Sequence, residues 1–162
     1  MRLAMILLAV ASLAGCSPEP SEEERQAAVA EVEANQAPAP EELQLQPIEF
    51  ADIEANDLFG AGCNFVADGG GAGSLAIAMA ETGYVKKDGE ILEFAADTGS
   101  AELPYLARRE YDGKAYSFTL DLDESTAAPT GIETSDYSGS LTVFDPQGRP
   151  VYQSTGIVQC GA

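Results

Sequence analysis

The sequence of 162 residues contains neither histidine nor tryptophan. Histidine is the commonest metal ligand and general base near neutral pH, so both roles are lost with it. Serine, cysteine and zinc hydrolase mechanisms that depend on imidazole are therefore excluded. A pair of catalytic carboxylates stays open, but no spacing singles one out. We expect a protein that is not an enzyme, with no catalytic residues, no metal ligands and no cofactor.

Basic residues are also scarce. The chain has 8 lysines and arginines against 27 aspartates and glutamates, which gives a formal net charge of −19 at pH 7. Nucleic acids and anionic membrane surfaces repel such a chain, whereas basic proteins and cations attract it. Nucleic-acid binding requires a basic stripe and is excluded. The partner that this charge favours is a basic protein, and the sequence does not identify a ligand.

The chain lacks a hydrophobic run long enough to cross a bilayer, which needs roughly 20 apolar residues. Its longest run follows Arg2, spans about a dozen residues and ends in small residues before Cys16. A positive charge, a short apolar stretch and a small-residue cleavage site form the layout of a secretory signal peptide. The last four residues resemble the lipobox of bacterial lipoproteins, and they are Leu13, Ala14, Gly15 and Cys16.

The lipobox resemblance implies that cleavage falls before Cys16 and that a diacylglyceryl group on its thiol anchors the mature protein in a membrane. In Gram-negative lipoproteins a residue other than aspartate after the cysteine, here Ser17, implies passage to the outer membrane. The resemblance therefore places the protein in the bacterial cell envelope, facing the periplasm. An ordinary export signal with an incidental cysteine is the alternative.

Two cysteines remain once Cys16 is assigned to lipid. Cys63 and Cys160 form an even pair, and in an oxidising compartment outside the cytoplasm such a pair predicts a disulfide. The bridge would close most of the domain into one loop and tie its first strand to its last. A reduced, buried pair of thiols is the alternative.

Residues 16–47 are predicted to form an acidic tether rather than part of the folded domain. Ser21 and Glu24 match a capping box, which predicts a helix over residues 22–35. Its apolar side is mostly alanine, so it has little surface to bury, and isolated helices of this length are marginal in water. A proline–alanine spacer follows it. A coiled-coil or partner-binding helix is the alternative to a solvated tether.

Residues 48–162 are predicted to form one all-β domain, either a small antiparallel sandwich or a barrel of about seven or eight strands. Short alternating stretches recur between turn residues along this part of the chain. Two dipeptides are typical of hairpin turns, Asp88-Gly89 and Asp112-Gly113. The second is predicted to join a strand over residues 105–109 to one over residues 115–122. The domain order is therefore a signal peptide (1–15), a tether (16–47) and a β domain (48–162).

Three acids near the middle of the domain form a candidate calcium site, and they are Asp121, Asp123 and Glu124. An EF-hand loop starting at Asp121 needs glycine at its sixth position and glutamate at its twelfth. Thr126 and Ile132 stand there instead, so that loop is excluded. A weak, irregular site survives as one alternative, and a solvated strand end is the favoured one.

Two further patterns invite a binding interpretation. The glycine-rich residues 69–73 lack the lysine of a phosphate-binding loop and are predicted to be a flexible connection. The basic pairs at 86–87 and 108–109 could form an anion or peptide site. Because successive strand residues point to opposite faces, they are better explained as side chains that balance nearby carboxylates and protect strand edges from pairing.

Residues 137–140, Tyr-Ser-Gly-Ser, resemble a family of bacterial lysozyme inhibitors. Members are lipoproteins with a small antiparallel barrel, a disulfide and a Ser-Gly loop presented to the enzyme cleft. The family motif continues to an aromatic residue and later a lysine, which are absent here because Leu141 follows. We expect a binding or structural module of the envelope, and inhibition of a hydrolase such as lysozyme is the alternative.

Overall fold

A computed structural model describes residues 20–36 and 39–162, so Cys16 and the signal peptide lie outside the described residues. The chain divides into two compact units, the first ending at Ala39 and the second spanning Pro40–Ala162. In the first unit, α1 (Glu22–Gln36) confirms the predicted helix. The Ser21 N–H donates to Glu24 Oε2 at 2.7 Å, and the Glu24 N–H donates to Ser21 Oγ at 3.2 Å. The capping box therefore forms, and the backbone hydrogen bond from Ser21 lowers the pKa of Glu24.

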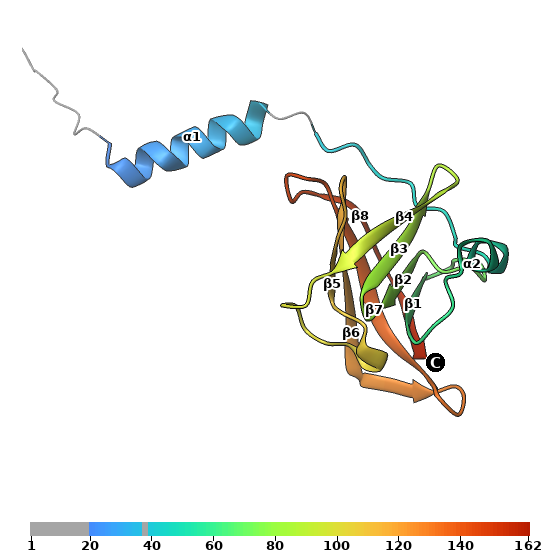
Figure 1. The fold of residues 1–162 in the computed structure, drawn as a ribbon. Coiled ribbons are helices and arrows are strands. Elements are labelled where there is room, and N and C mark those ends of the chain that lie inside the picture. Colours follow the sequence, from blue (N-terminus) through green and yellow to red (C-terminus); the bar gives the residue numbers. More distant parts are fainter. Residues whose placement is uncertain (1–19, 37–38) are drawn as a thin grey trace, which may run out of the picture. The chain divides into compact units, whose positions relative to one another are not determined.

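The second unit is a closed barrel of eight antiparallel strands (Figure 1). Each strand pairs with its neighbours in the sequence, and the last pairs with the first. The all-β prediction is thereby confirmed, and of the two predicted architectures the chain adopts the barrel. The strands are β1 (Gly62–Ala67), β2 (Ala76–Met79), β3 (Thr82–Lys87), β4 (Glu90–Ala96), β5 (Glu110–Asp112), β6 (Ser117–Pro129), β7 (Thr134–Phe144) and β8 (Pro150–Gly161).

Turn chemistry explains where the strands stop. Asp88 and Gly89 both have positive φ, +51° and +82°, as a two-residue hairpin turn between β3 and β4 requires. The strand predicted over residues 105–109 is wrong. A short 3₁₀ turn, η1 (Pro104–Leu106), lies there, and β5 begins only at Glu110. Proline at the start of η1 cannot donate to a ladder, and the two residues after it adopt left-handed φ values, which ends the extended run.

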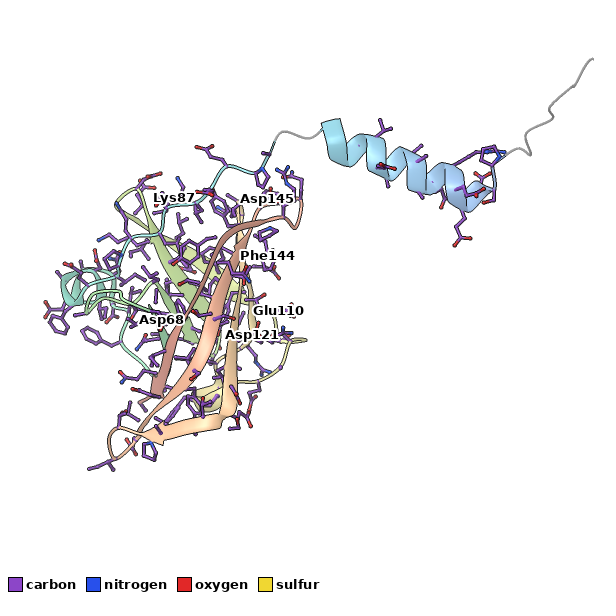
Figure 2. All side chains as sticks on the ribbon, turned by 180° about the vertical axis from the view of Figure 1, so that it is seen from behind. Asp68, Lys87, Glu110, Asp121, Phe144 and Asp145 are labelled. Carbon is purple, nitrogen blue, oxygen red and sulfur yellow. A yellow bond between two sulfur atoms is a disulfide. The ribbon has the colours of Figure 1, made fainter. Side chains whose placement is uncertain are left out.

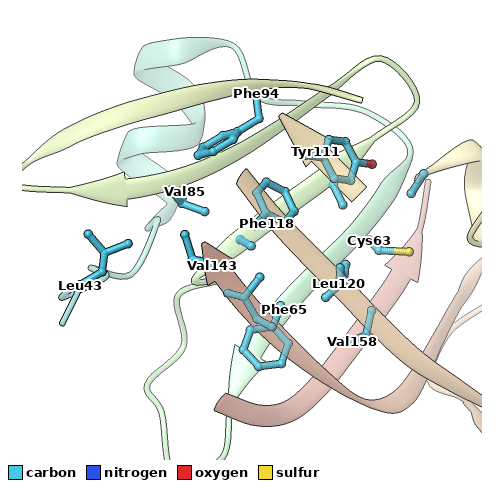
Figure 3. Packing of buried hydrophobic residues seen from close by; sticks show 14 of the residues in the cluster. Leu43, Cys63, Phe65, Val85, Phe94, Tyr111, Phe118, Leu120, Val143 and Val158 are labelled. Atoms are coloured by element: carbon cyan, nitrogen blue, oxygen red, sulfur yellow. The ribbon is translucent and has the colours of Figure 1, made fainter. Parts of the chain in front are cut away.

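Aromatic rings fill the barrel interior (Figure 3). The Phe118 ring stacks on Tyr111 with centroids 4.7 Å apart and meets Phe94 edge-on at 5.1 Å. The Tyr111 hydroxyl accepts a hydrogen bond from the Arg108 N–H and donates one to the Met79 carbonyl oxygen, both at 2.7 Å. Burial raises the pKa of Tyr111. The interior is therefore a packed core rather than an open ligand cavity.

The pairing of β1 with β8 closes the barrel. Cys63 stands directly opposite Cys160 in this pair, with Cα atoms 4.0 Å apart, and the two are joined by a disulfide. The predicted bridge between the first and last strands is confirmed. Both cysteines are buried, so the disulfide is shielded from solvent within the β1–β8 pair.

Residues 40–47, which the sequence assigns to the tether, contact the barrel. Leu43 is buried in the core, and its N–H donates to the Val151 carbonyl oxygen at 2.8 Å. Gln46 and Ile48 then form bridges to Lys86 and Ser74. The chain next forms α2 (Phe50–Asn56) on the outside of the barrel, above a second apolar cluster built from Ile48, Leu58 and Ile77.

The strand register defines two ends of the barrel. The end that we call the tether end carries Leu43, the 88–89 turn, the 113–116 turn and the 145–148 turn. Figure 2 shows Lys87 and Asp145 at this end. The opposite end, which we call the C-terminal end, carries residues 59–62, η1, the loop between β6 and β7, and the chain terminus.

Candidate functional site

Exposed apolar side chains gather toward the C-terminal end of the barrel. Phe50 is 65% exposed, Phe59 is 58% exposed, and Ile132 at the tip of the β6–β7 loop is fully exposed. Tyr105 and Leu106 of η1 add to this set. Exposed apolar residues scattered singly are ordinary on a protein surface, whereas contiguous ones mark interaction sites. The two phenylalanines form such a contiguous pair, because their rings meet edge-to-face with centroids 6.3 Å apart.

A groove of about 270 Å³ runs beside this pair, and we call it the phenylalanine groove. Phe50, Ile53 and Phe59 line it from α2 and the segment that follows. Asn64 of β1 and Gln159 of β8, which pair with each other across the sheet, line it from the barrel wall. The groove continues to the last two residues of the chain. It thus joins apolar walls to polar side chains that can hydrogen-bond a ligand.

Local sequence sets this geometry. The Glu49 side chain and the Asp52 side chain cap the first turn of α2, and Asp52 also pairs with Lys86 of β3 at 2.7 Å. The hydrogen bond from Lys86 lowers the pKa of Asp52. Asp57 ends the helix in the left-handed conformation, with φ +54°, which turns the chain back to the barrel. Helix α2 is therefore fixed at both ends, with Phe50 as its first residue and Phe59 in the segment that follows it.

Four carboxylates without an ion-pair partner in the described structure lie within two residues of lining residues of the phenylalanine groove. They follow or precede lining residues in the sequence, and all four are exposed: Glu54, Asp57, Glu81 and Glu133. None of them takes part in an ion pair of the described structure. No lysine or arginine lines the groove. The groove is therefore lined by aromatic and aliphatic side chains together with polar groups, and acidic residues lie close to its lining residues in the sequence.

Most basic residues of the barrel form ion pairs with carboxylates that do not line the phenylalanine groove. Lys86 pairs with Asp52, Lys87 with Asp88, Arg108 with Glu102, Arg109 with Asp121 and Glu110, and Arg149 with Asp145. The interpretation of the 86–87 and 108–109 pairs as charge-balancing side chains is thereby confirmed, but they protect no strand edge, because the sheet closes into a barrel. Lys114, in the turn between β5 and β6, has no ion-pair partner in residues 40–162, and it lies at the tether end.

The three acids proposed for calcium do not converge. Asp121 accepts a hydrogen bond from Arg109 Nε at 2.6 Å, on the side of the barrel where Figure 2 labels Asp121 and Glu110. Asp123 instead accepts from the Ser125 N–H and hydroxyl, which lower its pKa. Within residues 20–36 and 39–162 no group of three or more histidine, cysteine or acidic side chains is placed to hold a metal ion.

The Ser-Gly stretch that resembles the lysozyme inhibitors lies inside a strand. Ser138, Gly139 and Ser140 pair with β6 on one side and with β8 on the other. A Cβ atom at Gly139 would lie 2.2 Å from the Asp121 carbonyl oxygen and 2.6 Å from a Val158 methyl group. Glycine at position 139 therefore allows the neighbouring strands to approach closely. Residues 138–140 belong to a strand and do not form a loop that could enter an enzyme cleft.

A second hollow, of about 450 Å³, lies between β4 and the 113–116 turn at the tether end. Its apolar side chains, Ile91, Leu92 and Phe94, are half-buried or buried. The phenylalanine groove differs from it in having two exposed aromatic rings in contact at its edge.

The sequence analysis missed Phe50 and Phe59. The available signal was an aromatic residue on each side of a short helical stretch, outside any alternating strand pattern. No helix in the described part of the chain is long and apolar enough to span a membrane. Comparison with protein-family models, with curated proteins and with solved structures finds no match for this chain.

Proposed function

We propose that this protein is a lipoprotein of the bacterial envelope, anchored through Cys16 in the outer membrane and facing the periplasm, with its barrel acting as a binding module that is not an enzyme. The lipobox and the signal-peptide layout support the anchor. The exposed Phe50–Phe59 pair beside the phenylalanine groove carries the binding assignment.

The exposure of this pair is the informative observation because the barrel buries four other aromatic rings in its core. Phe65, Phe94, Phe118 and Tyr111 are all at most 2% exposed. Burying a phenylalanine side chain stabilises a protein by about 1.5–3 kcal/mol, so two rings left in water forgo that gain. A partner that covers them would recover it.

The position of the groove suits a tethered protein. The chain from the tether joins the barrel at residues 40–43, at the tether end. Phe59 and the terminus lie at the opposite end. The residues at which the chain enters the barrel and the phenylalanine groove therefore lie at different ends of the second unit.

Inhibition of a hydrolase is the second candidate function, and the β6–β7 loop is the observation that favours it. Ile132 is fully exposed at the tip of this loop. The Tyr105 hydroxyl donates to the Glu133 carbonyl oxygen at 2.6 Å and braces the loop from the side. A braced, projecting tip is suited to entering an enzyme cleft.

Site-specific photo-crosslinking in the producing bacterium tests the proposed function. Benzoyl-phenylalanine at position 59 should give a discrete crosslinked species, and the same probe at Gln147, exposed at the tether end, should give none. A probe at Ile132 that captures a hydrolase while position 59 captures nothing would favour the inhibitor alternative. Identical patterns from positions 59 and 147 would count against the phenylalanine groove as the binding surface.

A further inference from the structure

We infer that the phenylalanine groove takes a cationic protein segment that inserts one bulky apolar side chain between Phe50 and the barrel wall. This inference rests on the proposed function and adds the chemistry of the partner. It depends on three properties of the site: its size, its surrounding charge and the arrangement of those charges along α2.

The size of the groove favours a side chain over a whole small molecule. Its volume is about 270 Å³, whereas pockets for drug-sized ligands and cofactors span about 300–1,000 Å³. Protein interfaces are commonly anchored by one or two buried aromatic or aliphatic side chains at their centre. Phe50, Ile53 and Phe59 supply apolar walls for such an anchor, and Asn64 and Gln159 supply polar groups at its edge.

The surrounding charge selects a positive partner. Glu54, Asp57, Glu81 and Glu133 are each within two residues of a lining residue in the sequence, and no described cation pairs with them. Complementary charge at the rim of an interface speeds association and rejects partners of the wrong sign. A second copy of this chain is such a wrong partner, since its own net charge is −19.

The spacing along α2 places an acid next to the apolar anchor point. Glu54 is four residues after Phe50, so the two lie on one face of α2, and Asp57 follows the last residue of the helix. Residues three or four apart on a helix have Cβ atoms about 5–6 Å apart. A partner with an arginine or lysine beside its apolar anchor would satisfy both contacts at once.

Fluorescence anisotropy with short synthetic peptides tests the inference on the full chain held in zwitterionic nanodiscs. One peptide alternates arginine with phenylalanine, a second has glutamate for each arginine, and a third has serine for each phenylalanine. Only the first should bind well. Its affinity should fall as salt rises from about 0.05 to about 0.3 M, because rim charges are screened.

Two charge variants make a matched comparison. Glu54→Gln with Asp57→Asn should weaken the arginine–phenylalanine peptide about threefold to tenfold and reduce its salt dependence. Glu90→Gln with Glu93→Gln removes the same charge from exposed positions of β4, and it should leave the affinity unchanged. Phe50→Ala with Phe59→Ala should weaken binding at least tenfold.

The outcomes separate this inference from the proposed function. Equal losses from the two charge variants would show attraction to net charge only and would overturn the inference. Equal binding of the arginine and glutamate peptides, or no binding of either, would overturn it too. A crosslink at position 59 together with either result would leave the proposed function standing, and loss of that crosslink would remove both.

Discussion

At the scale of single residues, the core depends on a glycine as much as on its aromatic rings. Gly83 of β3 is buried and faces the Phe118 and Tyr111 rings. A Cβ atom at this position would lie 2.6 Å from Phe118 and 2.7 Å from Tyr111. The stacked pair therefore occupies space that any other residue at position 83 would need.

Gly83→Ala should destabilise the protein by about 1–3 kcal/mol, because an added methyl group forces the rings out of their preferred positions. Urea unfolding followed by tyrosine fluorescence measures the change. Gly71→Ala is the control, since nothing lies within 4 Å of a Cβ atom there. Equal stability of the two variants would mean that the core yields to the extra methyl group.

Asp145 shows how a nearly buried carboxylate is kept charged. It accepts hydrogen bonds from the backbone N–H groups of Gln147 and Arg149 at 2.9 Å and from Arg149 Nε at 2.7 Å. Burial by itself raises the pKa of Asp145, but these hydrogen bonds and the Arg149 charge outweigh it. The net pKa lies below the ordinary value of 3.8.

Asp145→Asn should lower the melting temperature at neutral pH, and the difference from wild type should shrink as the pH falls. A carboxylate whose pKa is depressed by folding contributes stability above its unfolded pKa and loses it as the pH drops through the folded value. The difference should therefore decline below about pH 4. Melting curves from neutral to acidic pH measure it. A difference that stays constant down to the lowest pH would contradict the charged role of Asp145.

At the scale of elements, residues 40–48 act as a strap along the barrel. Leu43 plugs the tether end, and Gln46 binds the 88–89 turn through its side-chain oxygen, which accepts from the Gly89 N–H at 2.6 Å. The strap thus links the tether to the core. Removing residues 1–39 should leave the stability of the barrel unchanged, whereas removing residues 1–43 should lower it.

Leu43→Ala should cost about 2–4 kcal/mol, because it removes a buried side chain and leaves a cavity in the core. Val29→Ala in α1 removes an exposed apolar side chain and should cost far less. Chemical denaturation of both variants makes the comparison. An equal, small effect of both would mean that the strap does not hold the core.

The β1–β8 seam is the element that closes the barrel, and its disulfide spans a sequence separation of 97 residues. Reduction should destabilise the domain by about 2–4 kcal/mol, since the reduced unfolded chain gains conformational freedom. Urea unfolding with and without a reductant measures the loss. Unchanged stability after confirmed reduction would show that strand pairing alone holds the seam.

At the scale of the whole molecule, the proposed attachment and the proposed binding surface belong to different parts of the chain. The first unit contains a solvated helix with exposed Val29 and Val32, and the second contains the barrel and the phenylalanine groove. Acidic residues are spread over both, so the molecule as a whole avoids anionic surfaces. We therefore expect the proposed membrane attachment to depend on the lipid at Cys16.

Cys16→Ala should abolish membrane attachment without changing the barrel. Each buried methylene of an acyl chain contributes about 0.8 kcal/mol, so two or three chains give nearly permanent anchoring and none gives no anchoring. Detergent phase partitioning distinguishes the two forms, and circular dichroism checks the fold. A free Cys16 thiol in the mature wild-type protein, found by mass spectrometry, would contradict the lipobox interpretation.

The sequence by itself determined the class of the fold and the positions of several turns. Alternation in residues 115–122 and the Asp88-Gly89 dipeptide act over a few neighbours, so local patterns predict them. The two cysteines were enough to predict the disulfide. The strand over residues 105–109 failed because Pro104 and the left-handed turn after it overrode a sequence that reads as extended.

The tertiary structure decided closure, burial and exposure. A barrel rather than a sandwich results from the pairing of β1 with β8, which lie at opposite ends of the domain sequence. Leu43 lies in an acidic stretch that resembles a linker. It is nevertheless buried, because its side chain packs into the barrel core at the tether end. Phe50 and Phe65 are the same residue type, but one faces water and the other the core. That difference depends on which surfaces the folded chain brings together, and no local pattern records it.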